Sequence, residues 1–216
     1  MSLFSNMKKT IIFDWNGTLI DDTKFSLDIE NQLFRNRNLR EISLEEYREK
    51  FCFPVIEYYK NIGFDFKHHS FEQLSTEFNE IYNQQYRQCN LMENTLPLLR
   101  NLKTRGIHCL ILSASHQDHL NEQVRYFNLD SYFDDVIGTQ TIHAVSKVEQ
   151  GMNWIQSHKE KKEDCLFIGD TIHDSETAKA MGIDCILMDR GHQNYDVLKE
   201  SGRIIIHDLM ELLNHI

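Results

Sequence analysis

Six short apolar runs, separated by stretches with helical spacing, constrain the fold of this chain more than any other feature of its sequence. Most of these runs are continuous rather than alternating, which is typical of strands covered on both faces. The intervening stretches carry helix signals, such as the cap candidate Asn94 and the capping box of Ser146 and Glu149. This alternation predicts an α/β fold with a Rossmann-like, doubly wound parallel sheet. The predicted strands are 10–14, 108–113, 135–138, 164–169, 184–188 and 203–207.

One interval departs from the alternation. Between Thr18 and about Leu91 the sequence shows no convincing strand, and its apolar residues follow helical spacing, as in Phe25, Ile29 and Leu33. An insertion just past the end of a strand lies over the carboxyl edge of the sheet, where open α/β sheets bind ligands. The sequence therefore predicts a core domain of residues 1–18 and 92–216 and an inserted all-helical cap domain of residues 19–91, placed to act as a lid.

Composition limits the classes of partner. The chain has 216 residues and 41% hydrophobic residues, enough for a real core. Its formal net charge of −10 disfavours binding to nucleic acid. No apolar run reaches membrane-spanning length, and the first residues lack an apolar signal core, so we expect a cytoplasmic protein that does not bind membranes. The five cysteines form no C-x-x-C pair, which favours reduced thiols. We expect a monomer or a weak homodimer.

Polar side chains gather at the predicted strand ends. Asp14 ends the first strand in the segment DWNGT, and Ser113 ends the second. Lys147 begins a helix, and Asp170 and Asp174 follow an apolar strand in the segment GDTIHD. Because the carboxyl ends of parallel strands meet at one edge of the sheet, these side chains should surround a single cavity.

The three carboxylates point to a metal ion. Asp14, Asp170 and Asp174 cannot all remain ionised in a half-buried cleft without a compensating positive charge. Hard oxygen ligands with room for water suit Mg²⁺. We therefore expect Mg²⁺ as the cofactor.

The remaining groups suit a phosphate. Lys147 supplies a positive charge, Ser113 a hydroxyl donor, and the backbone N–H groups of Gly17 and Thr18 an anion nest in a tight turn. The arrangement suits in-line attack of the Asp14 carboxylate on phosphorus, which would give an aspartyl-phosphate.

In these motifs and in their order, the sequence resembles the haloacid dehalogenase superfamily, in the phosphoglycolate phosphatase and β-phosphoglucomutase branch with a helical cap. The resemblance implies an Mg²⁺-dependent phosphohydrolase for a small phosphorylated metabolite. It implies that Asp14 is the nucleophile, and that Mg²⁺ is held by Asp14, by the backbone carbonyl of Asn16 and by Asp170, with Asp174 bound directly or through water. It further implies roles for Thr18, which closes the nucleophile loop, and for the phosphate-binding residues Gly17, Ser113, Ala114 and Lys147.

Asn16 departs from the pattern of these phosphatases, which usually carry an aspartate there as general acid and base. An amide cannot exchange a proton at neutral pH, and general acid–base catalysis contributes about two to four powers of ten in rate. Asp21, Asp22 and His173 are alternative proton donors, but Asp22 is better placed to cap the first cap helix and His173 to face solvent or a neighbouring carboxylate. Three functions remain open: an impaired phosphatase, a slow or non-catalytic binding protein for a phosphorylated ligand or a partner protein, and a phosphotransferase.

Overall fold

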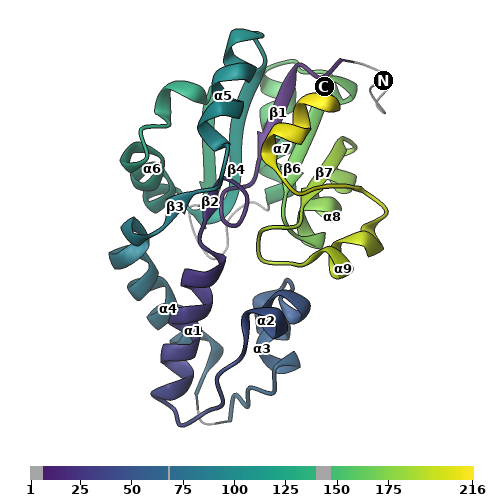
Figure 1. Ribbon diagram of the computed structural model, residues 1–216. Coiled ribbons are helices and arrows are strands. Elements are labelled where there is room, and N and C mark those ends of the chain that lie inside the picture. Colours follow the sequence, from purple (N-terminus) through teal and green to yellow (C-terminus); the bar gives the residue numbers. More distant parts are fainter. Residues whose placement is uncertain (1–6, 68, 140–146) are drawn as a thin grey trace.

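The computed structural model describes residues 7–67, 69–139 and 147–216. Within these residues six strands form one sheet in the order β5-β4-β1-β6-β7-β8, and every neighbouring pair is parallel, as predicted (Figure 1). The central strand is β1, which carries the start of the site. The strands are β1 (Thr10–Phe13), β4 (His108–His116), β5 (Asp135–Thr139), β6 (Cys165–Gly169), β7 (Asp184–Met188) and β8 (Ile204–Ile206).

Helices cover both faces of this sheet, which explains why its strands are continuous apolar runs. Ile11 and Phe13 of β1 belong to one buried cluster, whereas Ile12 belongs to another on the opposite face. The first cluster includes side chains of α5 (Thr95–Thr104), α6 (Gln117–Tyr126) and η5 (Leu209–Asn214). The second includes side chains of α7 (Lys147–Ser157), α8 (Ile172–Met181) and α9 (Tyr195–Leu198). The expected cap Ser146 lies outside the described residues. Short 3₁₀ helices η2 (Asp130–Tyr132), η3 (Lys162–Asp164) and η4 (Lys199–Ser201) complete this part.

In the described part of the chain between β1 and α5, four helices form a separate layer beyond one end of the sheet (Figure 1). Ser43 and Ser70 cap two of them, each by accepting a backbone N–H with its side chain. Aromatic and aliphatic side chains of this segment form a third buried cluster of their own. The helices are α1 (Thr23–Arg35), α2 (Leu44–Lys50), α3 (Val55–Asn61) and α4 (Phe71–Gln85), followed by η1 (Tyr86–Gln88).

The prediction that this interval contains no strand was wrong at its two ends. Strands β2 (Ile20–Asp21) and β3 (Asn90–Leu91) pair in antiparallel fashion where the chain enters and leaves the helical layer. Strands of two residues carry no periodic signal, so the sequence could not reveal them. The pair holds the two connections side by side, next to the end of β1.

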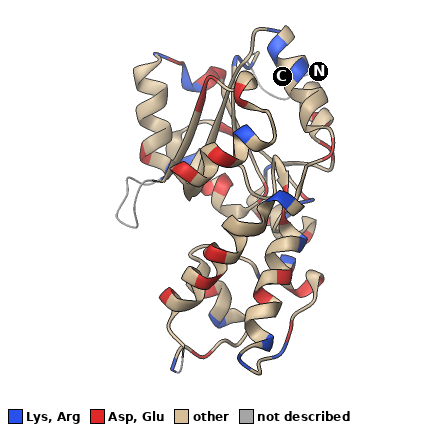
Figure 2. Ribbon diagram, turned by 90° about the vertical axis from the view of Figure 1, so that its left-hand side faces the viewer, with Lys and Arg blue, Asp and Glu red and all other residues tan. Residues whose placement is uncertain are grey.

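No helix within the described ranges is both long and apolar enough to cross a membrane. Acidic and basic residues are interspersed over the sheet layer and the helical layer (Figure 2).

Candidate functional site

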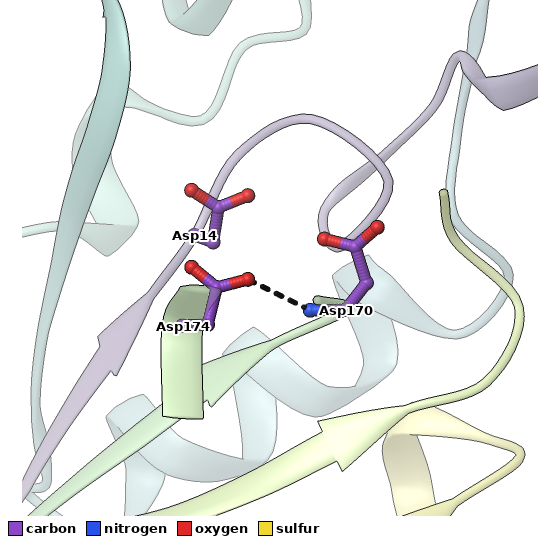
Figure 3. A group of neighbouring side chains, drawn as sticks. All are labelled: Asp14, Asp170 and Asp174. Atoms are coloured by element: carbon purple, nitrogen blue, oxygen red, sulfur yellow. Dashed lines mark hydrogen bonds between the residues drawn. The ribbon is translucent and has the colours of Figure 1, made fainter. Parts of the chain in front are cut away.

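Three aspartates meet where β1 and β6 end. Asp14 directly follows β1, Asp170 directly follows β6, and Asp174 lies in the first turn of α8. All three side chains are buried, and one carboxylate oxygen of each lies within 4.8 Å of the others (Figure 3). The Asp170 backbone N–H donates to Asp174 Oδ2 over 3.2 Å, which fixes the two acids relative to each other. The predicted convergence of strand ends thus brings these side chains together.

Lys147 supplies a positive charge in direct contact with this group. Its Nζ lies 2.6 Å from Asp14 Oδ1 and 2.8 Å from Asp174 Oδ1, and the side chain is buried. These two carboxylates raise the pKa of Lys147 although burial opposes them, so the ammonium stays charged. For Asp174 burial alone would raise the pKa, but Lys147 and the Thr171 hydroxyl together lower it.

The negative charges of Asp14 and Asp170 are not balanced by neighbouring positive charge. Burial raises the pKa of Asp14 to about 6 in spite of Lys147. Burial also raises the pKa of Asp170 to about 8, and the charges of Asp174 and Asp14 add to this effect. One lysine therefore does not balance three buried acids. A divalent cation with hard oxygen ligands fits this donor set, because it would supply the missing positive charge.

Two glycines leave room for the Asp170 carboxylate. A Cβ atom on Gly17, whose φ is +71°, would lie 2.2 Å from Asp170 Oδ2, and one on Gly191 would lie 2.1 Å from the same atom. The carboxylate accepts hydrogen bonds from the Thr18 hydroxyl (3.2 Å) and from the His192 backbone N–H (2.6 Å). The chain after β1 and the loop after β7 therefore close around Asp170, and neither position tolerates a side chain without displacing it.

A cavity of about 570 Å³ opens from the three acids towards the helical layer. The predicted phosphate-binding residues Ser113, Ala114 and Lys147 line it together with Asp14. Ser113 is buried within β4, and its Oγ accepts the Ser115 backbone N–H over 3.1 Å, which leaves its own hydroxyl hydrogen for another acceptor.

The anion nest expected from Gly17 and Thr18 is engaged in protein contacts. The Gly17 N–H donates to Asp22 Oδ1 over 2.8 Å, and the Thr18 N–H donates to the Trp15 carbonyl over 3.3 Å. A phosphate would have to displace these bonds, whereas Ser113, Ala114 and Lys147 line the cavity directly.

Asn16 lines the cavity and is held by three hydrogen bonds. Its Nδ2 donates to Asp22 Oδ2 (2.6 Å) and to the Tyr82 hydroxyl (2.8 Å), and its Oδ1 accepts from the Ser115 hydroxyl (2.8 Å). The amide therefore has a defined orientation, with the NH₂ group towards the connection between the two layers.

Asp22 does not cap the first helix with its side chain, contrary to expectation. It occupies the N-cap position of α1, but its buried carboxylate makes no cap bond. It accepts instead from Asn16, Gly17 and the Tyr82 hydroxyl, the last over 2.6 Å. Burial would raise the pKa of Asp22, but these bonds and His192 lower it.

His192, for which the sequence predicted no role, also belongs to the site. This buried side chain lies 3.4 Å from Asp22 Oδ1 through Nε2 and 2.8 Å from the Tyr47 hydroxyl through Nδ1. Burial opposes its charge, but Asp22 and Asp170 raise the pKa of His192 to about 9. It thus connects the helical layer, the chain after β1 and the acid site. The sequence does carry a signal for this residue, because the segment Gly191–His192 follows β7, the strand beside β6, and so lies at the same edge of the sheet as Asp170.

His173, considered above as a replacement acid, lies at the cavity wall. Its ring is 4.7 Å from the ring of Phe53, measured between centroids, and its Nδ1 is 4.0 Å from Glu176. Burial lowers the pKa of His173, which favours the neutral ring. Asp21, the other alternative, is exposed on β2.

A family model, two curated relatives and one solved structure that are similar to this chain describe hydrolases or phosphatases. The family model described as haloacid dehalogenase-like hydrolase matches residues 11–188. The phosphoglycolate phosphatase of Aquifex aeolicus is 29% identical over 187 residues, which cover 81% of this chain and 81% of that protein. A 5′-nucleotidase of Pseudomonas aeruginosa is 26% identical over 197 residues, covering 88% and 86% respectively. The crystal structure of a predicted phosphatase from Clostridium acetobutylicum superposes with a TM-score of 0.81 at 19% identity, covering 97% of this chain and 98% of that one.

Proposed function

Because the chain belongs to the haloacid dehalogenase-like hydrolase family, we propose that it is a phosphatase that hydrolyses a small phosphorylated metabolite with Asp14 as nucleophile. The observation that carries this proposal is the Asp14 carboxylate, which lies in a cavity wall beside Lys147, Asp170 and Asp174. The phosphoglycolate phosphatase among the relatives supports the same type of reaction. We further propose that residues 1–18 and 92–216 form the core and that residues 19–91 form the cap.

Mg²⁺ is the cofactor that this proposal requires. Asp14, the backbone carbonyl of Asn16 and Asp170 would hold it, with Asp174 bound directly or through water. When bound, Mg²⁺ supplies positive charge that offsets the carboxylates and the phosphate oxygens. Burial raises the pKa values of Asp14 and Asp170, and a bound cation would favour their ionised forms, which supports this assignment.

Each residue of the site has its own role in the proposed reaction. The Asp14 oxygen forms a bond to phosphorus while the bond from phosphorus to the leaving oxygen breaks. Lys147 and the Ser113 hydroxyl bind phosphate oxygens and orient the group. Water then attacks phosphorus, which releases inorganic phosphate and restores the Asp14 carboxylate. Asn16 cannot supply the proton that the leaving oxygen needs, so leaving groups that are stable as anions should react best.

The test is hydrolysis of p-nitrophenyl phosphate in the presence of Mg²⁺, since its leaving group needs no acid. The proposal predicts turnover that is lost on removal of Mg²⁺ with a chelator. Inactivity on this compound and on a panel of phosphorylated metabolites would contradict it.

The three hydrogen bonds of Asn16 favour a second candidate function. An amide fixed at the position of the general acid suits a protein that captures a phosphorylated ligand and turns it over slowly or not at all. Tight binding of beryllofluoride without hydrolysis would support this function. Product formation that depends on an acceptor other than water would instead indicate phosphoryl transfer.

Mg²⁺ is expected to stabilise the fold more at pH 8 than at pH 6. The folded-state pKa values of Asp14 and Asp170, about 6 and about 8, lie above those of unfolded aspartate. The metal-free protein therefore loses stability as pH rises from the unfolded pKa to the folded pKa of each group, and the loss from Asp170 continues up to about pH 8. Mg²⁺ binds the ionised acids and should reverse this loss. At a concentration about 100 times its Kd, it should add about 2.7 kcal/mol, or roughly 5–10 °C in Tm. Thermal melts at both pH values measure this.

Asp170→Asn provides the control for this experiment. It removes a proposed ligand together with one of the repelling charges, so its Tm should no longer respond to Mg²⁺. An equal Mg²⁺ response at both pH values, or a response that persists in Asp170→Asn, would rule out the acid cluster as the binding site.

A further inference from the structure

The side of the cavity formed by the helical layer is rich in aromatic side chains, with the polar side chains of Ser26, Ser75, Asn79 and Asn83 beside them. Aromatic rings of residues 51–82, from the end of α2 through α4, line it, and they surround the space into which the part of a substrate beyond its phosphate would extend. They are Phe51, Phe53, Tyr59, Phe71, Phe78 and Tyr82. Apolar ring faces of this kind bind flat groups or cations better than they bind anions.

Glu30 of α1 places a buried carboxyl group on this aromatic side. Its side chain lines the cavity, and the residue is only 3% exposed. The Tyr58 hydroxyl donates to Oε2 over 2.6 Å, and the Tyr59 hydroxyl donates to Oε1 over 3.4 Å. Each carboxyl oxygen has more than one acceptor site, so both can accept a further donor from a bound molecule.

The carboxyl group of Glu30 lacks solvation. Burial raises its pKa to about 7, although both tyrosines and the charge of His192 act in the opposite direction. An N–H donor or a cation on a ligand would replace the lost water contacts and stabilise the carboxylate.

The cavity offers little to a second anion. Among the described residues that line it, Lys147 is the only lysine and there is no arginine. Lys147 already bonds to Asp14 and Asp174, and the charged His192 ring faces Asp22. The imidazoles of His116, His119 and His173 line other parts of the wall. On the side of the helical layer, a second negative charge would therefore meet the Glu30 carboxyl group and aromatic rings and no lysine or arginine among the described lining residues.

We propose that the helical side of the cavity selects a phosphate monoester whose alcohol part bears an N–H group that bonds to Glu30, an apolar face that packs on the rings, and no second negative charge. This proposal rests on the phosphatase function proposed above. The N–H donor is shared by the amino group of a nucleobase and by an aliphatic ammonium group, and a nucleobase also supplies the apolar face.

A substrate panel with two variants tests the proposal. The N–H-bearing probes are cytidine 5′-monophosphate and phosphoethanolamine, and the doubly anionic probes are phosphoglycolate and pyrophosphate. The wild-type protein should turn over at least one N–H probe with a kcat/KM roughly tenfold above both anionic probes, the difference that one hydrogen bond to a charged group provides. The N–H probe with the higher kcat/KM shows whether the N–H donor is a nucleobase amino group or an aliphatic ammonium group.

The variants separate recognition from structure. Glu30→Gln keeps the shape of the side chain and removes its charge. It should lower kcat/KM for the preferred N–H probe roughly tenfold and so reduce the difference in kcat/KM between that probe and phosphoglycolate. Glu72→Gln is the matched control, because it also removes one carboxylate from the helical layer but from an exposed position in the first turn of α4. It should leave the order of the four substrates unchanged.

The outcomes that contradict this proposal differ from those that contradict the phosphatase function. Faster wild-type turnover of phosphoglycolate or pyrophosphate overturns the N–H preference, and this comparison does not require that Glu30→Gln folds. An equal loss on all substrates in Glu30→Gln assigns Glu30 a structural role and also overturns it. In both cases hydrolysis of p-nitrophenyl phosphate would leave the phosphatase function standing. If no compound reacts, p-nitrophenyl phosphate included, both proposals fail.

Discussion

Replacing Asp14 by asparagine is expected to abolish hydrolysis of p-nitrophenyl phosphate while the protein remains folded. The substitution removes the attacking oxygen anion but keeps the shape of the side chain at the end of β1. It also removes one of three buried carboxylates, and the pKa of Asp14, raised to about 6, means that its charge costs stability above that pH. The Tm of the metal-free variant near pH 8 should therefore be no lower than that of the wild type. Steady-state rates and thermal melts measure the two effects.

Asp130→Asn is the matched control for this variant, because Asp130 is an exposed aspartate of η2 that does not line the cavity. Its activity should equal that of the wild type. Residual hydrolysis in Asp14→Asn above about one per cent, well beyond what binding alone leaves after loss of a nucleophile, would place the nucleophile elsewhere.

Replacing Asn16 by aspartate is expected to accelerate hydrolysis of phosphate esters with poor leaving groups by roughly ten- to ten-thousand-fold, the scale of general acid catalysis. In the structure the Asn16 Nδ2 lies 2.6 Å from Asp22 Oδ2. A carboxyl group in the same place would face Asp22, and two adjacent acids hold one proton between them, which keeps a proton available for the leaving oxygen. The effect on p-nitrophenyl phosphate should be smaller, because its leaving group is already stable. Rates on an alkyl phosphate and on p-nitrophenyl phosphate give the comparison.

Two controls accompany this variant, one for the chemistry of proton transfer and one for the chemical identity of residue 16 in the wild-type protein. Asn16→Ser cannot transfer a proton at neutral pH and should not accelerate the reaction. The Asn16–Gly17 dipeptide is prone to deamidation, since glycine does not hinder closure of the succinimide, so peptide mapping of the wild-type protein must accompany the assay. If fresh, undeamidated protein hydrolyses alkyl phosphates rapidly and Asn16→Asp slows it, the amide is part of a different mechanism.

The sheet was predictable from local sequence because its apolar runs reflect burial on both faces. The strand predicted at 184–188 coincides with β7, and the others differ from the observed bounds by a few residues at their ends. Adjacent residues of β1 belong to different buried clusters, as Ile11 and Ile12 show, and only continuous apolar sequence satisfies this arrangement. The antiparallel pair of β2 and β3 was not predictable, because two residues make no pattern and their pairing joins chain segments far apart in sequence.

The candidate site was predictable where it depends on strand ends, and not where it depends on the helical layer. Asp14, Asp170 and Asp174 follow strands, and the order of the strands brings them together. Glu30 follows Ile29 within a helix and has the local sequence of a solvated acid. Its burial results from Tyr58 and Tyr59, which lie on a different helix. Asp22 has the local sequence of a helix cap, but contacts with residues distant in sequence, such as Tyr82, determine where its carboxylate points.

The most direct test of the central claim is to trap the phosphorylated form of Asp14. An aspartyl-phosphate is reduced by borohydride to homoserine, and Asn16 should favour its accumulation because an amide cannot activate the water that removes the phosphate. Protein quenched during turnover with Mg²⁺ and substrate, then reduced and mapped by mass spectrometry, is predicted to carry homoserine at position 14. The product should be absent without substrate, without Mg²⁺ and in Asp14→Asn. Hydrolysis that proceeds with position 14 unmodified, or with the modification at another residue, would contradict the account.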